Sequence, residues 1–178
     1  MRPPIDLIAI HRIDVTEAGY PNTASGIHAY FRDVKRWTWP AYTAVLWSST
    51  WWQWAGVGEM TNHGGKNWTS GCVSLACVGD YRTEDPAPIW RRSVETAAEL
   101  CWALDLDPHA THERLGMRVP CVAGHSELAT AEGRVWRCPG ERWDMDRFRL
   151  DVAAEIKRLR VDLPPVSPGE RLQLLGWR

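Results

Sequence analysis

Residues 1–14 read MRPPIDLIAIHRID, and the apolar run LIAI within them leads directly into His11. The length and composition of this run are typical of a short buried strand. A second apolar run, Val119 to Ala123, ends at Gly124 and is followed directly by His125. Because each run delivers an imidazole at its end, the two predict a sheet with a functional site at one edge.

Strand and helix patterns alternate along the rest of the chain. The predicted strands are 5–10, 41–47, 51–57, 72–78 and 119–123, and the predicted helices are 27–37, 89–104 and 145–159. The helices carry apolar residues at three-four spacing, which is typical of helices that pack on a sheet. This order predicts an α/β fold, a single mixed β-sheet flanked by helices.

The length of 178 residues fits one domain, and 44% hydrophobic with 24% charged residues indicates a globular protein. We expect this domain over residues 1–160. The segment 161–178 is a C-terminal tail that turns Pro-rich and then regains leucines and Trp177. The pattern leaves open whether the tail packs back on the domain or is a linker.

Charge and hydropathy exclude several partners. A net charge of -1 lacks the basic excess that nucleic-acid binding requires, so no nucleic-acid partner is expected. There is no apolar stretch of about 18 residues, so no membrane insertion is expected. The first apolar run has prolines before it and no small-residue cleavage site after it, so we expect a chain made in the cytoplasm without a signal peptide.

The five cysteines form no CxxC pair and are odd in number, which favours reduced thiols over a disulfide framework. Cys138 differs from the others because it stands in a polar Cys-Pro-Gly loop. Together with His11 and His125 it would make a three-ligand Zn²⁺ set that leaves a fourth position open, as in catalytic sites. Taken singly, each histidine could be held by a backbone carbonyl and Cys138 could be an inert thiol.

At this point the chain resembles a known family, the N-acetylmuramoyl-L-alanine amidases that include T7-type phage lysozyme and the peptidoglycan recognition proteins. The resemblance spans about residues 5–160. It rests on six segments in the family's order, IAIH at 8–11, the predicted helix 27–37, WPAYTAVLW at 39–47, NHGGKNWTS at 62–70, GHSE at 124–127 and CPG at 138–140.

The resemblance implies zinc-dependent hydrolysis of the amide bond between N-acetylmuramic acid and L-alanine in bacterial peptidoglycan. It implies His11, His125 and Cys138 as the metal ligands and Tyr42 as the residue that assists at the scissile carbonyl. It also implies peptidoglycan as the partner and lysis of the cell wall as the outcome. We expect a monomer. The short chain favours a bacteriophage endolysin that reaches the wall after release or export.

The segment 62–70 matches the part of the family that lines the substrate groove, which implies substrate contacts for His63, Asn67 and Ser70. Twelve tryptophans exceed the needs of a core of this size. Flat amphipathic rings suit a groove that holds sugar and peptide, so Trp68 and Trp136 are expected to contact substrate as well.

Several positions depart from the family. Thr43 stands where a histidine is frequent, Arg12 follows the first ligand, and Trp136 occupies the place of a Lys or Thr helper. Arg134 or Arg137 could replace that helper from the long loop before Cys138. Ser74, where the muropeptide-recycling members use a glutamate, favours the lysozyme-like branch.

The leaving amine must collect a proton, and Tyr42, metal-bound water or Glu127 could supply it. Tyr42, Arg137 and Glu127 are therefore the expected catalytic residues. The departures from the family leave a rival function, a module of the same fold that binds peptidoglycan without cutting it. A second rival keeps only the fold, binds a protein partner through the Trp-rich face and predicts no bound zinc.

Overall fold

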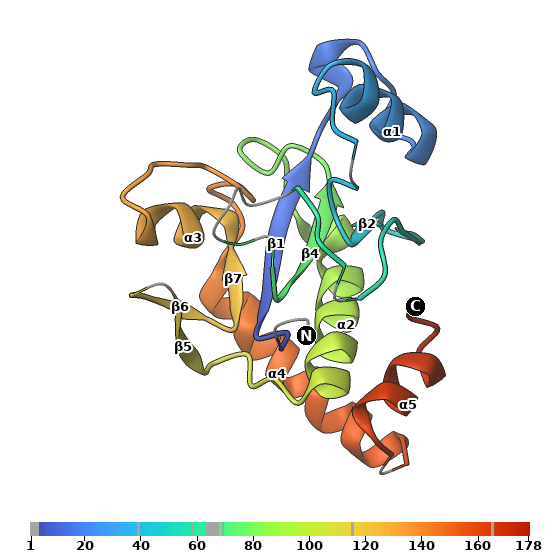
Figure 1. The fold of residues 1–178 in the computed structure, drawn as a ribbon, viewed down its shortest axis with the longest axis vertical. Coiled ribbons are helices and arrows are strands. Elements are labelled where there is room, and N and C mark those ends of the chain that lie inside the picture. Colours follow the sequence, from blue (N-terminus) through green and yellow to red (C-terminus); the bar gives the residue numbers. More distant parts are fainter. Residues whose placement is uncertain are drawn as a thin grey trace.

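The computed structural model describes residues 4–38, 40–57, 59–62, 68, 70–114, 116–164 and 166–178. It contains a five-stranded mixed sheet flanked by helices, which confirms the predicted fold class (Figure 1). The strand order is β3-β2-β4-β1-β7. These strands are β1 Leu7–Ile13, β2 Ala44–Leu46, β3 Trp51–Gln53, β4 Cys72–Val78 and β7 Val122–Gly124.

The register of the sheet places the first two candidate ligands side by side. β1 runs parallel to both β4 and β7, while β3 is the antiparallel edge strand next to β2. Ile10 on β1 lies opposite Gly124 on β7. His11 and His125 each come one residue later, so both emerge at the carboxyl edge of neighbouring parallel strands.

Three helices match the predicted ones with shifted bounds, and two short helices have no predicted counterpart. Together they are α1 Ala24–Asp33, α2 Ala87–Leu104, α3 His125–Ala131, α4 Met145–Asp162 and α5 Pro168–Leu174. Thr23 caps α1 by accepting a hydrogen bond from the backbone N–H of Gly26 (3.2 Å), whereas the sequence before the apolar stripe allows either Asn22 or Thr23 as the cap. In the described part of the chain, no helix has both the length and the apolar character to cross a bilayer.

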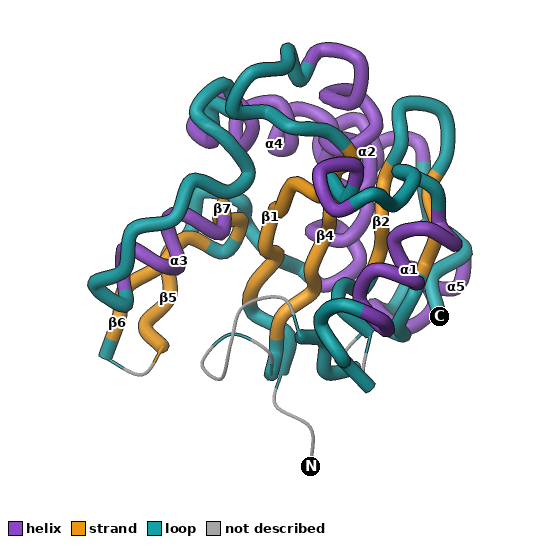
Figure 2. The backbone as a smooth tube through the Cα atoms, turned by 90° about the horizontal axis from the view of Figure 1, so that it is seen from above, coloured by secondary structure: helices purple, strands orange, loops and turns teal. Residues whose placement is uncertain are grey.

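The two long helices, α2 and α4, cover one face of the sheet (Figure 2). Ile8, Ile10 and Leu75 point to this face and pack with Phe148 of α4 in the largest apolar cluster. Phe148 is fully buried, and burying such a ring stabilises the fold by about 2 to 3 kcal/mol. On the opposite face, α1 and α3 contribute to separate, smaller clusters.

The hairpin β5 Thr111–Arg114 and β6 Met117–Pro120 is a difference from the sequence interpretation. The predicted strand 119–123 is divided between β6 and β7 at Cys121. No strand was predicted over β5 because its side chains are exposed or half-buried and show no apolar alternation.

The C-terminal tail packs back on the domain. Trp177 is buried and stacks on Trp51 of β3, with ring centroids 4.5 Å apart. The side-chain amide of Gln53 donates to the carbonyl oxygen of Arg178 (2.9 Å), and its oxygen accepts from the Arg178 N–H (3.1 Å). Arg171 of α5 donates to the carbonyl oxygen of Trp102 on α2 (2.7 Å). The tail therefore joins α2 to the β3 edge of the sheet.

Candidate metal centre and its cavity

The two candidate histidine ligands are adjacent at the sheet edge. His11 lies near the end of β1 and is 1% exposed. His125 is the first residue of α3 and follows β7 without an intervening loop. Their ring centroids are 4.6 Å apart and the ring planes are inclined by 53°. The strand pairing of β1 with β7 thus sets the distance between the imidazoles.

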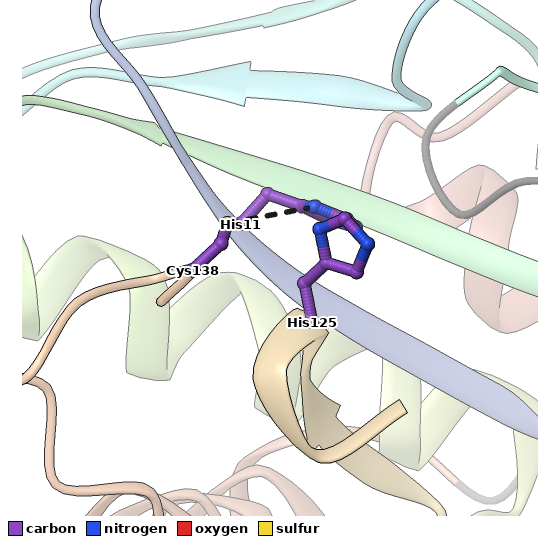
Figure 3. A group of neighbouring side chains, drawn as sticks. All are labelled: His11, His125 and Cys138. Carbon is purple, nitrogen blue, oxygen red and sulfur yellow. Dashed lines mark hydrogen bonds between the residues drawn. The ribbon is translucent and has the colours of Figure 1, made fainter. Parts of the chain in front are cut away.

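Cys138 comes to the histidines from the loop between α3 and α4. Its Sγ lies 3.8 Å from Nδ1 of His11, and the backbone N–H of Arg12 donates to the same sulfur (3.3 Å). The backbone N–H of Ser126 donates to the carbonyl oxygen of Cys138 (2.6 Å). Figure 3 shows the three side chains arriving from separate segments and pointing toward one another.

Two glycines let the Cys138 loop approach this closely. A Cβ on Gly140 would lie 2.3 Å from the backbone carbonyl group of Tyr81, and the residue has a φ of +143° that only glycine adopts readily. A Cβ on Gly124 would lie 3.1 Å from Cδ of Pro139. Gly140 is therefore required by close backbone packing, and Gly124 gives a tight fit against the side chain of Pro139.

The donor set fits a zinc ion. One ligand atom from each of His11, His125 and Cys138 lies within 4.8 Å of the others. In a tetrahedral zinc site with bonds of about 2.0 to 2.3 Å, ligand atoms lie roughly 3.3 to 3.8 Å apart, so small side-chain rotations complete the set. Two imidazoles and a thiolate are ligands that zinc prefers, and three protein ligands leave one position open.

Burial shifts the pKa values of two of the three donors, His125 and Cys138. Burial lowers the pKa of His125 to about 4, with a further contribution from Arg134, so the imidazole is neutral and its lone pair is available at pH 7. Burial raises the pKa of the Cys138 thiol to about 11, and the Arg12 N–H and charge oppose that increase. A buried thiol of this kind becomes a thiolate when a cation binds it.

A cavity of about 400 Å³ opens over the three donors. Besides them, it is lined by six residues from the predicted site and its surroundings, Tyr42, Trp136, Arg137, Arg12, Arg82 and Asp14. It is further lined by residues of α1 and the turn after it, Tyr30, Phe31, Lys35 and Trp37, and by Ile13 and Val15. The cavity thus joins the candidate metal centre to an aromatic wall.

Tyr42 lies beside His11, with ring centroids 5.2 Å apart, and its ring also packs edge-on against Phe31. It is 9% exposed. Burial raises the pKa of the phenol well above its usual value of about 10, so Tyr42 keeps its proton at neutral pH. A protonated hydroxyl can donate a hydrogen bond into the cavity.

Trp136 and Arg137 lie at the mouth of the cavity. The indole of Trp136 stacks on the His125 ring with centroids 5.3 Å apart and remains 52% exposed. Arg137 is largely exposed and pairs with Glu141 through its Nη1 (3.1 Å). Arg134 pairs with Glu132 and is absent from the lining of this cavity.

Three predicted site residues lie elsewhere. Glu127 faces away from the cavity, where its carboxylate accepts from the Gly124 N–H and from Arg149. Trp68 is fully buried in the cluster that contains Leu7. Trp68 therefore packs in the core, whereas the sequence predicted that it contacts substrate.

Ser70 lies at the other end of the sheet from the metal centre. It precedes Cys72, which is opposite Leu7, whereas His11 is opposite Ala76 at the far end of the same strand pair. Ser70 is absent from the cavity lining. His63 and Asn67, the remaining predicted substrate contacts, lie outside the described residues.

Arg12, Asp80 and Arg82 form linked ion pairs that were not predicted from the sequence. The guanidinium of Arg12 pairs with Asp80 (2.6 Å), and Asp80 also pairs with Arg82 (2.6 Å). These contacts hold the pKa of Asp80 below its usual value, chiefly through the hydrogen bond from Arg82. The departure from the family at Arg12 was the available signal, but its partner is 68 residues away in the sequence.

The buried residues Thr43 and Ser74 form a hydroxyl network next to Tyr42. The Thr43 N–H donates to Oγ of Ser74 (2.9 Å), and the Ser74 N–H donates to Oγ1 of Thr43 (3.1 Å). Thr61 joins through its hydroxyl at 3.0 Å from the Ser74 hydroxyl. At these two departures from the family, hydrogen bonds join the residue before β2 to β4.

Comparisons by sequence find no family profile and no curated protein that matches the chain. Comparison of the structure, in contrast, finds solved proteins with the same fold. It is the fold of N-acetylmuramoyl-L-alanine amidases and phage endolysins, shared by Drosophila PGRP-LB at a TM-score of 0.55. The predicted resemblance is thus confirmed at the level of the fold.

Three solved structures show how far this similarity extends. The Ph2119 endolysin from a Thermus scotoductus bacteriophage is 16% identical, with a TM-score of 0.62 over 85% of this chain and 87% of that one. The Staphylococcus aureus hydrolase AmiA is 15% identical, with a TM-score of 0.66 over 93% and 78%. The amidase LysC from Clostridium intestinale is 13% identical, with a TM-score of 0.61 over 85% and 86%.

Proposed function

We propose that this protein is a zinc-dependent N-acetylmuramoyl-L-alanine amidase of the endolysin type. It would hydrolyse the amide bond between N-acetylmuramic acid and L-alanine in peptidoglycan. The observation that carries the proposal is the convergence of two imidazoles and one thiol within 4.8 Å, beneath an open cavity, in an amidase fold. A binding protein of this fold has no need for a complete ligand set with a free position.

Zinc held by His11, His125 and Cys138 would act as a Lewis acid on the scissile carbonyl and would make water nucleophilic at neutral pH. The residues of the chain orient the substrate and move the proton. Tyr42 keeps its proton, lines the cavity and has its ring 5.2 Å from the ring of His11. Its O–H can donate to the carbonyl oxygen as negative charge develops there.

Cleavage of the amide also requires a proton on the departing nitrogen of L-alanine. Tyr42 is placed to transfer a proton because it lies within the cavity and beside His11. Glu127 is not retained in this role, since its carboxylate faces away from the cavity and is bound by Arg149. The proton lost from the attacking water would return the phenol to its neutral form.

The walls of the cavity suit a glycopeptide. The exposed face of Trp136 can stack against a sugar ring, and Trp37 lies on the α1 side of the cavity, with Arg137 at the mouth as a hydrogen-bond donor. A PGRP-LB variant with this fold has been solved in complex with tracheal cytotoxin, at 16% identity and a TM-score of 0.56. These features support peptidoglycan as the substrate.

One observation favours the rival function, a module that binds peptidoglycan without cutting it. Trp136 stacks on His125 at the position where the family carries a Lys or Thr helper. Arg134, which could have replaced that helper, does not line the cavity. In that case the metal centre would be structural. The experiment below separates the two functions.

The test is the release of new amino termini from purified peptidoglycan by zinc-loaded protein. We expect release of N-terminal L-alanine by the wild-type chain, and loss of release after chelation or in Cys138→Ala. Cys121→Ala, which removes a thiol outside the cavity, is the matched control and should keep the activity. Sedimentation of the protein with cell walls without any new amino terminus would establish the binding module instead.

A further inference from the structure

The start of α3 carries a network that begins two residues after His125. Oε2 of Glu127 accepts a hydrogen bond from the backbone N–H of Gly124 (2.8 Å) and so caps the helix on which His125 is the first residue. This contact fixes the last peptide unit of β7, one residue before His125. The direction of the His125 side chain depends on that junction of β7 with α3.

Arg149 of α4 anchors the same carboxylate from inside the protein. Its Nη1 and Nη2 donate to Oε2 and Oε1 of Glu127 (3.0 and 3.1 Å), a bidentate pair. Nη1 also donates to the carbonyl oxygen of Val122 on β7 (3.0 Å), and Nη2 to Asp146 (2.7 Å). Arg149 is 8% exposed. One buried guanidinium therefore ties α4, β7 and the start of α3 together.

The loop that carries Cys138 is bound to the same junction. The Ser126 N–H donates to the carbonyl oxygen of Cys138 (2.6 Å), and Gly124 packs against Pro139. A shift at the start of α3 would consequently move His125 and disturb the Cys138 loop at the same time. Two of the three ligands share one support.

We propose that Glu127 and Arg149 form a positioning pair that sets the zinc affinity of the site by fixing His125 relative to Cys138. The inference rests on the proposed metal site. Glu127 does not act on substrate, because it is absent from the lining of the cavity above the ligands. The bidentate geometry matters because a planar guanidinium fixes a carboxylate in both position and orientation, which a lysine ammonium does not.

The experiment measures the zinc dissociation constant of each protein by competition with a chromophoric chelator. Each measurement starts from apo protein and is made below the unfolding temperature of that protein. Glu127→Gln keeps an acceptor for the Gly124 N–H but loses the charged pair, and Arg149→Lys keeps the charge but loses the fork. We expect each variant to bind zinc about tenfold more weakly, the lower end of the range for residues that support metal ligands.

A matched control is available on the same helix. Arg158 pairs with Glu155 on the exposed side of α4 (2.5 Å), away from the ligands. Glu155→Gln and Arg158→Lys should leave the zinc dissociation constant unchanged. A third test variant, Glu127→Leu with Arg149→Met, removes both charges together and leaves no unpaired buried guanidinium, so it should fold while still binding zinc weakly.

The outcomes separate this inference from the proposed function. If the wild-type chain binds zinc and the zinc dissociation constants of the variants lie within twofold of the wild-type value, the pair only stabilises the fold and the inference is overturned. This holds even where the variants have lower thermal stability. If the wild-type chain binds no zinc, the proposed function fails and the inference fails with it. A weakened affinity in folded variants, with unchanged controls, supports positioning.

Discussion

At the scale of single residues, the proposed hydrolysis depends on the hydroxyl group of Tyr42. Its ring lies beside His11, and burial keeps the phenol protonated. We expect Tyr42→Phe to lower kcat by about 10²- to 10³-fold, the usual cost of removing one oxyanion donor, because the hydroxyl acts only in the transition state. Steady-state hydrolysis of a soluble muramyl peptide would measure this, with zinc content determined in parallel.

Tyr30→Phe is the control for that substitution, since Tyr30 lines the same cavity from α1. It should keep kcat within a few-fold of wild type. A Tyr42→Phe protein that retains zinc and full kcat would show that another group protonates the leaving amine.

The grouping of the three candidate ligands could be predicted from the sequence, whereas their supports could not. His11 and His125 each follow an apolar strand directly, Cys138 stands in a distinctive turn, and the family resemblance joined the three into one candidate set. Arg149 lies in an amphipathic helix of ordinary appearance, and nothing local links it to Glu127 across 22 residues. Contacts between distant segments appear only in the folded chain.

At the scale of elements, the Cys-Pro-Gly turn determines whether the third ligand reaches the site. Gly140→Ala places a methyl group 2.3 Å from the carbonyl of Tyr81 and strains a φ of +143°. We expect a loss of about 1 to 3 kcal/mol in the free energy of unfolding, together with weaker zinc binding, because the turn must move. Urea denaturation of the apo protein measures the first effect.

Gly133→Ala is the control in the same loop. It also has a positive φ, of +70°, but a Cβ there meets no atom within 4 Å. It should lose no zinc affinity. If both glycine variants behave alike, backbone strain alone explains the result and the close packing on Tyr81 is unimportant.

The C-terminal tail gives a prediction about stability that is separate from catalysis. Trp177 is 3% exposed and stacks on Trp51, so Trp177→Ala should cost about 3 kcal/mol or more of unfolding free energy. Leu174→Ala, at a residue that is 58% exposed, should change it by less than about 0.5 kcal/mol. Both can be measured by thermal and chemical denaturation.

Because the tail joins α2 to the β3 edge and contributes nothing to the cavity lining, Trp177→Ala should keep wild-type kcat below its unfolding temperature. A large loss of kcat in the folded variant would mean that the tail supports the site after all.

Some elements were predictable and others depended on tertiary structure. Long apolar stripes predicted α2 and α4 because a helix that packs on a sheet must bury one face along its whole length. The hairpin of β5 and β6 was missed, since its stability comes from pairing between strands with exposed side chains. The docking of the tail was left open because Trp177 needs Trp51 as its partner, 126 residues earlier in the chain.

At the scale of the whole molecule, zinc should stabilise the fold, because its ligands come from β1, α3 and the loop before α4. At a free zinc concentration 100 times the dissociation constant, binding adds about 2.7 kcal/mol to the free energy of unfolding. For a chain of this length, that corresponds to a rise of roughly 5 to 10 °C in Tm. Differential scanning calorimetry with and without chelator measures the shift.

Cys138→Ala should show a much smaller shift than wild type, since two imidazoles hold zinc weakly. An equal shift in the wild-type and Cys138→Ala proteins would indicate that zinc binds elsewhere on the chain.

The fold was predictable from the order of short motifs even though no family profile matches the chain. Each motif occupies a position that the fold constrains: IAIH in the central strand, and GHSE and CPG where glycine permits close packing. The remaining sequence can diverge because many apolar combinations fill the same core. Structural similarity therefore persists at 13 to 17% identity.

The proposed function requires that His11, His125 and Cys138 share one zinc ion. X-ray absorption at the zinc edge, on protein loaded with one equivalent of zinc, tests it most directly. The account predicts a first shell of one sulfur at about 2.3 Å and nitrogen or oxygen atoms at about 2.0 to 2.1 Å, with the sulfur signal absent from Cys138→Ala. A wild-type spectrum without sulfur, or protein that does not retain the equivalent of zinc, would contradict it.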